Sequence, residues 1–439
     1  MIFWRLIPAE ERKMKRTIGV VGGGAAGMTA AIAAAEQGAE VTLFEGNDRI
    51  GKKILSTGNG KCNLGNMDMS IEKYSTKNPE LLQGYLEKFG TNETIEFFRS
   101  LGLLVKQKNG YLYPVSEQAS SVLDVLRFKI GRTSEINVKT GCRVDRIERD
   151  KKRNCIRIWS GKETFSFDKM ILACGGKAAS GTGSDGSGYK LAQMLGHGLI
   201  PVVPALVQLK CREDWLKSIA GVRADAEITL MKNGRKEAVE RGELQLTDYG
   251  ISGIPVFQLS REVGYILREQ NEVEIRIDFL PDFVREGFGE KLMRARIPLE
   301  ACNTVEEYFT GMLNKKLMTL FIRLAGMKPT ESVSFVDVKK IVRVYELCRE
   351  LKVHVYAENS FDNAQVCAGG VPLSEVTDKL ESKVAPGVFF AGELLDVDGR
   401  CGGYNLQWAW CSGYLAGVYA ADGEIENVTF KSGKNKDRA

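Results

Sequence analysis

The chain has 439 residues, 44% of them hydrophobic and 27% charged, and its formal net charge is +5. These values are typical of a globular protein with room for two or three domains, and the mild charge argues against a nucleic-acid partner. No run of about 18 apolar residues is present, so we expect no membrane span. Ten cysteines without C-x-x-C spacing and only two histidines argue against a metal site and predict reduced thiols in a cytoplasmic protein.

The two ends of the chain are expected to lie outside the folded part. Residues 1–16 lack the charged-then-apolar order of a secretion signal, so we expect an N-terminal extension, with either Met1 or Met14 as the native start. Residues 426–439 are polar and basic and predict a flexible tail.

The rest of the chain is organised around residues 17–45, which have the pattern of a nucleotide-binding β-α-β unit. A β-branched run, 17–21, predicts a buried parallel strand, and the Ala-rich stretch 25–37 predicts a helix. Between them Gly22, Gly24 and Gly27 form G-x-G-x-x-G. A second predicted strand ends at Glu45. The complete order is far more specific than the glycines alone.

Each part of this unit has a separate physical role. Gly22 permits the tight turn, Gly24 lets a pyrophosphate approach the backbone, and Gly27 lets the helix pack closely. The helix N-terminus offers unpaired N–H groups to the phosphates. A carboxylate at Glu45 can accept hydrogen bonds from ribose hydroxyls. The unit therefore predicts a dinucleotide-binding fold and leaves open whether the dinucleotide is FAD or NAD.

The next segment, 46–66, is dense in Gly, Asn, Lys and Ser/Thr, and a long loop of this kind is usually functional. Its position after Glu45 would let it run along the dinucleotide. A solvated surface loop is the alternative. The candidates for contacts with phosphate are Lys52, Lys53 and Lys61, and those for contacts with a ring system are Thr57, Asn59 and Asn63.

The middle of the chain predicts packing elements. Residues 80–101 and 120–130 show helical spacing, and 142–173 contains three β-like runs that suggest a meander. A second glycine-rich loop, 181–198, lacks the strands of a nucleotide site, so a separate nicotinamide site is the less favoured interpretation. His197, just past a predicted helix end, is expected to interact with the helix C-terminus.

An inserted domain is predicted at 205–351. Its first part, 205–280, has the pattern of strands, and 281–351 has that of helices. The insert shows no phosphate loop and no acid–base cluster. We interpret it as a cap that shapes a substrate pocket, with an oligomerisation module as the alternative.

The last block returns to glycine-rich sequence. A buried strand, GVFFAGELLD, is followed by a turn at Gly402 and Gly403 and then by a helix. The N-terminus of that helix can stabilise negative charge on a ligand.

These motifs together resemble a known family. The opening β-α-β unit, MILACGG and FFAGELLD resemble the two-dinucleotide-binding-domain flavoproteins. More narrowly, GKKILSTGNGKCNLGN, GELQLTDYGISG and AGELLDVDGRCGGYNLQWAWCSGYLAG are similar to the YhiN/BaiN-type, aminoacetone-oxidase-like family of FAD-dependent oxidoreductases. The resemblance runs from about Thr17 to Gly417.

The resemblance implies an α/β fold with a Rossmann-like FAD-binding domain, formed by 17–204 and 352–425 and interrupted by the insert. It also implies non-covalent FAD held by residues of several motifs. These cofactor-binding candidates are Gly22, Gly24, Ala25, Ala26 and Gly27 for the pyrophosphate; Glu45 for the ribose; Lys53, Thr57, Gly58, Asn59, Gly60 and Cys62 for the flavin side; Val144 for adenine; and Ala173, Cys174, Gly175, Gly392, Glu393, Gly403, Tyr404, Asn405 and Leu406 near the flavin.

The family's activity implies hydride transfer through the flavin, which carries most of the chemistry. We expect NADH- or NADPH-driven reduction of an activated C=C bond, of the enone type found in steroids and bile acids. A flavin oxidase of a small amine that produces hydrogen peroxide, and a non-catalytic FAD-containing RNA- or protein-binding factor, stay open as alternatives. The substrate is expected to be a small molecule, and the oligomeric state is open.

The catalytic candidates lie in the loop expected to face the flavin ring. Arg400 can hold a carbonyl or carboxylate, the Tyr404 hydroxyl can donate a proton to an enolate, and Asn405 can contact substrate. A purely cofactor-binding or turn-stabilising role is the alternative for each of the three.

Overall fold

The protein is described by a computed structural model that covers residues 15–283, 291 and 298–425. The expected extension up to residue 14 and the expected tail 426–439 lie outside the described residues. The chain forms two compact units. The first combines Met1–Pro201 with Gly369–Ala439, and the second is Val202–Ala368.

The centre of the first unit is a five-stranded sheet in which every neighbouring pair is parallel. The predicted β-branched run is the middle strand, which pairs with a parallel strand on each side, and its apolar side chains are buried on the faces of the sheet. The order is β20 (Val388–Phe390), β11 (Lys169–Leu172), β1 (Thr17–Val21), β2 (Glu40–Phe44) and β7 (Ile136–Lys139).

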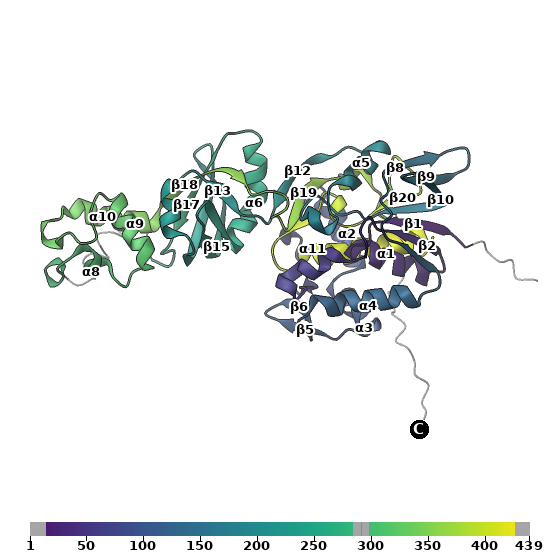
Figure 1. Cartoon of the computed structure of the whole chain (residues 1–439), viewed down its shortest axis with the longest axis horizontal. Helices are drawn as coiled ribbons and strands as arrows, with labels where there is room; N and C mark the ends of the chain where they lie inside the picture. The colour runs from purple at the N-terminus through teal and green to yellow at the C-terminus, as the bar shows by residue number, and fades with distance from the viewer. Residues whose placement is uncertain (1–14, 284–290, 292–297, 426–439) are drawn as a thin grey trace, which may run out of the picture. The chain divides into compact units, whose positions relative to one another are not determined.

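Two buried helices, which meet through Ala and Gly residues, pack against each other beside this sheet (Figure 1). They are α1 (Ala25–Glu36) and α11 (Tyr404–Ala420). A Cβ on Gly413 would lie 2.4 Å from the Ala26 carbonyl oxygen, and one on Gly417 would lie 2.4 Å from that of Ala30. Only glycine in α11 permits this approach, so the two helices hold one another, and their N-termini, in a fixed place.

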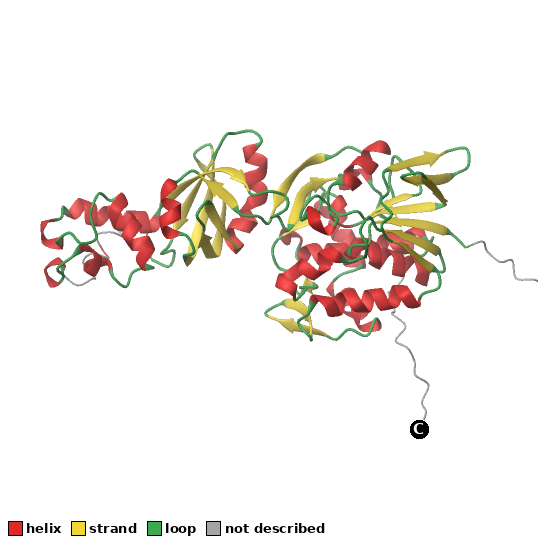
Figure 2. Ribbon diagram, in the orientation of Figure 1, coloured by secondary structure: helices red, strands yellow, loops and turns green. Residues whose placement is uncertain are grey.

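Smaller elements surround this centre, and helices lie alongside the sheet in Figure 2. A three-stranded sheet has the order β3-β6-β5, and a two-stranded sheet joins β21 and β4. The bounds of these strands and of the surrounding helices are β3 (Gly65–Asn66), β4 (Tyr74–Ser75), β5 (Val105–Lys108), β6 (Tyr111–Pro114), β21 (Asp398–Gly399), α2 (Pro79–Lys88), α3 (Thr91–Ser100), α4 (Ala119–Arg132) and α5 (Ser187–Met194).

The expected meander over 142–173 differs in its third run. Strands β8 (Arg146–Asp150), β9 (Cys155–Ser160) and β10 (Glu163–Phe167) form an antiparallel sheet. The run then passes at Asp168 into β11 of the parallel sheet. Apolar residues continue across this change of partner, so the sequence pattern does not reveal it.

The second unit contains a closed barrel of six strands in the order β13-β16-β15-β14-β17-β18. The insert was expected to end at residue 351, but β18 pairs with β13 and β17 and so belongs to this barrel. Closing the barrel buries the last strand's alternating apolar side chains. The bounds are β13 (Leu209–Cys211), β14 (Arg223–Lys232), β15 (Arg235–Leu246), β16 (Gly250–Gly253), β17 (Val273–Asp278) and β18 (Leu351–Glu358).

Helices of the second unit share one apolar core with the barrel. The described helices are α6 (Ile254–Leu267), α8 (Val305–Phe309), α9 (Lys315–Leu324) and α10 (Val338–Arg349). Where the chain passes between the units, β12 (Ile200–Ala205) and β19 (Val366–Gly370) form a two-stranded sheet.

His197 is buried in the first unit, and its amide donates to the Ala192 carbonyl in the last turn of α5 at 3.1 Å, whereas its side chain bonds residues far along the chain. Its Nδ1 lies 2.6 Å from Glu375 Oε2, and its Nε2 lies 2.8 Å from Ser382 Oγ. The Ser382 hydroxyl also accepts hydrogen bonds from the amides of Val384 and Ala385, and Ser382 is 3% exposed. The three side chains therefore hold a turn in place, and the serine is not presented to a substrate.

Candidate active site

The N-terminus of α1 is open on its outer side. Gly22 has φ +106°, in the region that favours glycine, and a Cβ on Gly27 would lie only 1.8 Å from the Gly22 carbonyl oxygen. A Cβ on Gly24, by contrast, would meet nothing within 4 Å. The amides of Ala25 and Ala26 belong to the first turn, where N–H groups have no partner within the helix. This end of the helix fits a pyrophosphate.

Glu45 is fixed beside this glycine turn. Its Oε2 accepts a hydrogen bond of 3.0 Å from the Gly23 amide. Its Oε1 accepts bonds of 2.8 Å from both the amide and the side-chain amide of Asn47. The carboxylate therefore has one orientation at the carboxyl ends of β1 and β2, and it keeps acceptor capacity for ribose hydroxyls.

The loop expected along the cofactor is a 3₁₀ segment, η1 (Lys52–Gly60), broken by non-helical residues from Thr57 to Asn59. Gly58, Asn59 and Gly60 are exposed. The Thr57 hydroxyl donates to the Ile54 carbonyl at 2.6 Å. Cys62 is fully buried, and burial raises the pKa of its thiol to about 12, so it is a packing residue and not a nucleophile.

An ion pair connects three of the expected cofactor segments. Lys53 Nζ lies 2.9 Å from Glu393 Oε2, in the 3₁₀ turn Gly392–Leu394. A Cβ on Gly176 would lie 2.8 Å from Glu393 Oε1, so this carboxylate also contacts the loop after β11. Lys53 and Glu393 are thus brought together, and each holds the other's segment.

The expected residues after β11 line the same edge of the sheet. The Ala173 amide donates to the Val21 carbonyl at 2.9 Å, and Cys174 Sγ lies 3.5 Å from that oxygen. Gly175 has φ +71°, and a Cβ there would lie 2.7 Å from Ser184 Oγ. These contacts place the 173–175 backbone next to the β1 end of the glycine turn.

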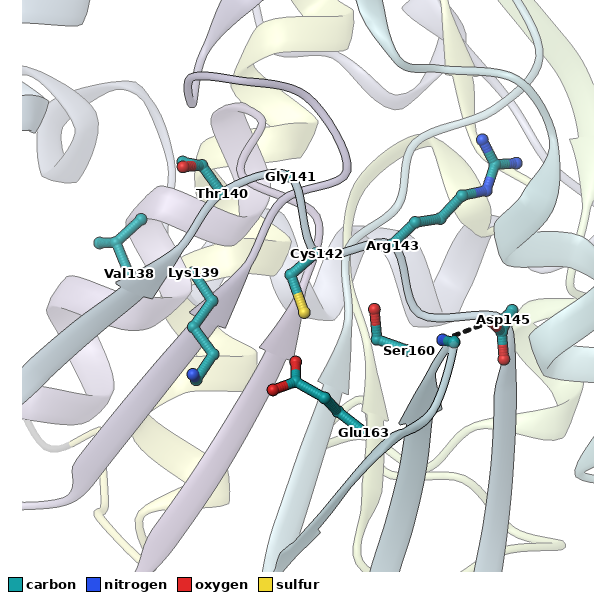
Figure 3. Close-up of a pocket in the computed structure, with 10 residues that line it drawn as sticks. Val138, Lys139, Thr140, Gly141, Cys142, Arg143, Asp145, Ser160 and Glu163 are labelled. Carbon is teal, nitrogen blue, oxygen red and sulfur yellow. Dashed lines mark hydrogen bonds between the residues drawn. The ribbon is translucent and has the colours of Figure 1, made fainter.

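Val144 lies apart from these residues, between β7 and the meander, and it is 4% exposed. Its neighbours Cys142, Arg143 and Asp145 line a pocket of about 620 Å³. Figure 3 shows the Cys142 side chain pointing towards the strand that carries Glu163, while Arg143 points the other way. Arg143 pairs with Asp185 at 2.5 Å. The Cys142 amide donates to the Glu45 carbonyl at 2.9 Å, so this loop adjoins the end of β2.

The N-terminus of α11 is enclosed. Gly402 and Gly403 have φ of +134° and +94°. A Cβ on Gly403 would lie 2.7 Å from both Asn63 Oδ1 and the Gly65 carbonyl oxygen. Asn63 Oδ1 is buried and accepts no hydrogen bond from the described residues. A buried acceptor of this kind beside a helix N-terminus fits a ligand ring that carries an N–H group. Gly392 is tied to the same helix, because its amide donates to Ser412 Oγ at 2.8 Å.

A cluster of polar side chains surrounds Tyr404, the first residue of α11. Tyr404 is 5% exposed, and burial raises the pKa of its hydroxyl to about 12. The charges of Asp68 and Tyr111 add to this rise, and the charge of Arg400 opposes it. The Tyr74 ring packs edge-on against the Tyr404 ring at 5.6 Å between centroids. Tyr404 therefore stays protonated across the ordinary pH range.

Asn405 differs from the expectation of a catalytic role. Its Oδ1 accepts a hydrogen bond of 2.8 Å from the Gly399 amide, and its Nδ2 donates one of 2.7 Å to the Gly399 carbonyl. Both ends of the side chain are used on the turn that carries Arg400. The geometry therefore favours a positioning role for Asn405. Leu406, the next residue, is partly exposed.

The sequence reasoning missed two members of the Tyr404 cluster, Tyr111 and Asp68. The alternation of Tyr111 and Tyr113 along a short strand places both rings on one face. Asn66 connects this region to α11, because its Nδ2 donates to the Gly402 carbonyl at 3.1 Å and its Oδ1 accepts from the Asp68 amide. A dense run of Asn, Gly and Asp in 63–68 was the available signal.

A sequence model of the HI0933-like protein Rossmann domain matches residues 16–419. The chain belongs to this family. It is 46% identical over 412 residues to the 3-dehydro-bile acid delta(4,6)-reductase of Clostridium scindens, covering 92% of this chain and 99% of that protein. It is 28% identical to the ribosomal RNA dihydrouridine synthase of Haemophilus influenzae, covering 91% and 97%, and 28% to that of Escherichia coli, covering 90% and 95%.

This HI0933-like protein is an FAD-dependent oxidoreductase with a Rossmann-type FAD-binding domain, so the predicted family and fold class are confirmed. The alternative of a non-catalytic factor is set aside. None of the helices in the described parts of the chain is long and apolar enough to cross a membrane. Among the same described residues, no group of three or more His, Cys, Asp or Glu side chains is arranged to hold a metal ion.

Proposed function

We propose that this FAD-dependent oxidoreductase reduces a carbon–carbon double bond conjugated to a carbonyl group in a steroid-like small molecule, with NADH or NADPH as the electron donor. One observation carries the proposal. The Tyr404 side chain is buried at the start of α11, beside the Tyr111 ring, and burial raises the pKa of its hydroxyl to about 12, so it stays protonated, while the charge of Arg400 acts on it.

The chemistry of the relatives supports the type of bond. One relative is named for the reduction of a 3-dehydro-bile acid, and two others are named dihydrouridine synthases. Saturating the uracil ring and reducing an enone both act on a C=C bond conjugated to a carbonyl. The higher identity and the small net charge favour the steroid-like molecule over RNA for this chain.

The residues of the Tyr404 cluster would divide the reaction between them. The net change adds one hydride and one proton to the double bond, and bound FAD, once reduced by the nicotinamide donor, would supply the hydride. Arg400 would hydrogen-bond the carbonyl oxygen and stabilise the negative charge that develops there. The Tyr404 hydroxyl would donate the proton to the carbon next to that carbonyl. Asn405 would hold the Gly399–Arg400 turn in place.

The cofactor would be held by the residues expected from the resemblance. The open turn Gly22–Gly27, with the Ala25 and Ala26 amides, would hold the pyrophosphate, and Glu45 would hold the adenosine ribose. The segments joined by the Lys53–Glu393 pair would line the flavin, and Asn63 Oδ1 would accept a hydrogen bond from its ring. The other residues that we expect to contact the cofactor are Thr57, Gly58, Asn59, Gly60, Cys62, Val144, Ala173, Cys174, Gly175, Gly392, Gly403 and Leu406.

The electron donor and the compartment belong to the same proposal. Reduction of a C=C bond consumes two electrons, which NADH or NADPH would provide. All ten cysteines are free thiols, which supports a reducing, cytoplasmic location.

An anaerobic titration of the FAD-loaded protein with NADH and then NADPH tests the donor. We expect the oxidised-flavin absorbance to bleach in proportion to the nucleotide added. Subsequent addition of a steroid enone should restore the absorbance and yield a product with two more hydrogens. A flavin that neither nucleotide bleaches would overturn the assignment of the donor.

The rival activities give different products. A small-amine oxidase would produce hydrogen peroxide in proportion to amine consumed in air, and the enone would stay unchanged. An RNA-directed enzyme would raise the dihydrouridine content of ribosomal RNA, which mass spectrometry of nuclease digests detects. We expect neither product.

A further inference from the structure

A small pocket of about 130 Å³ lies between the end of η1 and the β5–β6 hairpin, which Figure 1 shows at one edge of the first unit. Apart from Tyr111, its lining residues have no part in the reaction proposed above. We call it the basic pocket. Its lining residues are Lys61, Lys108, Asn109, Tyr111, Tyr113 and Glu117.

The pocket has an excess of positive charge. Glu117 accepts from Lys106 Nζ at 2.6 Å and from Lys61 Nζ at 3.0 Å. These two hydrogen bonds lower the pKa of the Glu117 carboxyl to about 2, so it is ionised under working conditions. Lys108 makes no ion pair with the described residues. Two ammonium groups therefore meet one carboxylate, and Lys108 adds a third positive charge to the pocket lining.

Two tyrosines supply neutral hydrogen-bond donors and ring surface. Tyr111 and Tyr113 alternate along β6 and face the same side of the hairpin. Burial raises the pKa of the Tyr113 hydroxyl, so Tyr113 stays a phenol that can donate to an anion. Tyr111 is 37% exposed, which leaves its ring open to a ligand. Ammonium and phenol groups around a small cavity form a receptor for a carboxylate or phosphate oxygen.

The basic pocket adjoins the Tyr404 cluster through Tyr111. A Cβ on Gly402 would lie 3.0 Å from both the Tyr111 and the Tyr404 rings. Tyr111 thus lines the pocket and also lies close to the ring of the proposed proton donor. A charged group held here would belong to a molecule that also reaches the reaction site.

We propose that the basic pocket binds the anionic group of one of the two small-molecule reactants, either the pyrophosphate of the nicotinamide donor or the carboxylate of an acidic steroid. This inference deepens the proposed function, because it assumes that Tyr404 marks the reaction site. The shared chemistry is an oxyanion that needs two or more donors, and the two sources are separable by experiment.

The test uses calorimetry on the FAD-loaded protein, so that it does not depend on turnover. The ligands are inorganic pyrophosphate, cholate and the uncharged methyl ester of cholate. The variants are Lys108→Met and the double substitution Lys61→Met with Lys108→Met. Lys152→Met, in an exposed turn of the meander, makes the same change in net charge away from the pocket. Flavin content of each preparation reports on folding and on cofactor retention.

We expect each pocket lysine to account for roughly a fivefold to tenfold change in Kd for one anion. Weakened pyrophosphate binding assigns the pocket to the donor, and weakened cholate binding with unchanged ester binding assigns it to the substrate. The inference is overturned if wild type binds neither anion, if Lys108→Met matches Lys152→Met for both, or if the ester weakens as much as cholate. Absence of enone reduction with an intact effect on pyrophosphate would overturn the proposed function alone.

Discussion

The N-termini of α1 and α11 are both built with glycine, but glycine serves them in opposite ways. At α1 the central glycine, Gly24, borders open space, so the backbone itself is the binding surface. At α11, Gly402 and Gly403 are enclosed by Tyr111, Asn63 and Gly65. There the glycines let side chains from distant segments approach the helix, and Tyr404 and its neighbours supply the chemistry.

We therefore expect the N-terminus of α1 to bind the cofactor and the N-terminus of α11 to take part in the reaction. A site made of backbone can be recognised from a local motif, because one turn contains all of it. A site made of converging side chains depends on the packing that joins the segments. The close contact of α11 with α1 links the two, since Gly413 and Gly417 fix where both helices begin.

The largest expected effect comes from removing the close packing at α1. Gly27→Ala would place a Cβ 1.8 Å from the Gly22 carbonyl oxygen, so the helix start must move. We expect the free energy of unfolding to fall by about 3 kcal/mol or more. Denaturant unfolding measures this. The control is Gly84→Ala in α2, where an added Cβ would meet nothing within 4 Å, and this variant should be neutral or stabilising. Equal unfolding curves for the two variants would contradict this account of α1.

A substitution at the enclosed N-terminus of α11 should lower the reaction rate and leave FAD binding unchanged. Tyr404→Phe removes the proposed proton donor, and we expect kcat for enone reduction to fall by about 100-fold or more with FAD content unchanged. Because the pKa of Tyr404 is raised to about 12, the wild-type donor is present below that pH and lost above it, so the proton-transfer rate should be flat from neutral pH to about pH 10.

Tyr74→Phe is the matched control for this site. It also removes one buried hydroxyl, whose hydrogen bond of 3.2 Å goes to the Tyr404 carbonyl oxygen. We expect a loss of about 1 kcal/mol in unfolding free energy and a change in kcat of only a few-fold. Single-turnover kinetics that show the same loss in both variants would remove Tyr404 from the proton-transfer step.

A substitution at the open N-terminus of α1 should weaken FAD binding and leave the stability of the fold unchanged. Gly24→Ala fills the space beside the α1 amides, and Gly24 has φ −82°, which alanine adopts freely. We expect FAD affinity to fall about tenfold or more, with the unfolding free energy of the FAD-free protein within about 1 kcal/mol of wild type. Fluorescence titration of FAD into the FAD-free protein measures the affinity. An unchanged Kd would mean that the pyrophosphate does not approach this turn.

The smallest effect is expected at His197, away from both helix ends. Burial lowers the pKa of its imidazole below the usual value of about 6.5, although Glu375 opposes the shift. As the pH falls, His197 therefore takes up its proton in the unfolded chain before it does so in the folded protein. The stability that neutral His197 contributes is present above the pKa of the unfolded chain and is lost as the pH falls through that value towards the lower pKa of the folded protein.

His197→Gln should remove this acid-sensitive part and cost about 1 kcal/mol at neutral pH. Thermal unfolding of both proteins between pH 7 and pH 5 checks this. Parallel pH profiles for the two proteins would show that His197 does not cause the acid sensitivity. The FAD affinity of this variant should stay at the wild-type value. A weaker affinity would show that a loss of stability alone is enough to weaken cofactor binding.

Much of the first unit could be predicted because its information is local. Residues 17–45 contain a strand, a turn, a helix, a second strand and a terminal acid within one short stretch, and each has its own pattern. The apolar run that becomes β11 was found, but its separation from β10 was not, because burial on two different sheets gives the same apolar pattern.

The remaining errors concern partners that are distant in sequence. Strand β18 alternates like any half-buried strand, and only its pairing with β13 and β17 reveals the barrel. The approach of Tyr111 to Gly402 and the two hydrogen bonds between the Asn405 amide and Gly399 are contacts that the local sequence does not reveal. The side-chain partners of His197 were missed for the same reason, since Glu375 and Ser382 come from a segment far along the chain.

The central claim is that reduced FAD in this protein delivers its electrons to a conjugated C=C bond. The most direct measurement mixes the anaerobically photoreduced holoenzyme with one equivalent of a steroid enone and follows the flavin absorbance while the product is analysed by mass spectrometry. We predict full return of the oxidised-flavin absorbance and one equivalent of a product heavier by two hydrogens. A flavin that stays reduced with the enone, but reoxidises in air with release of hydrogen peroxide, would contradict the claim.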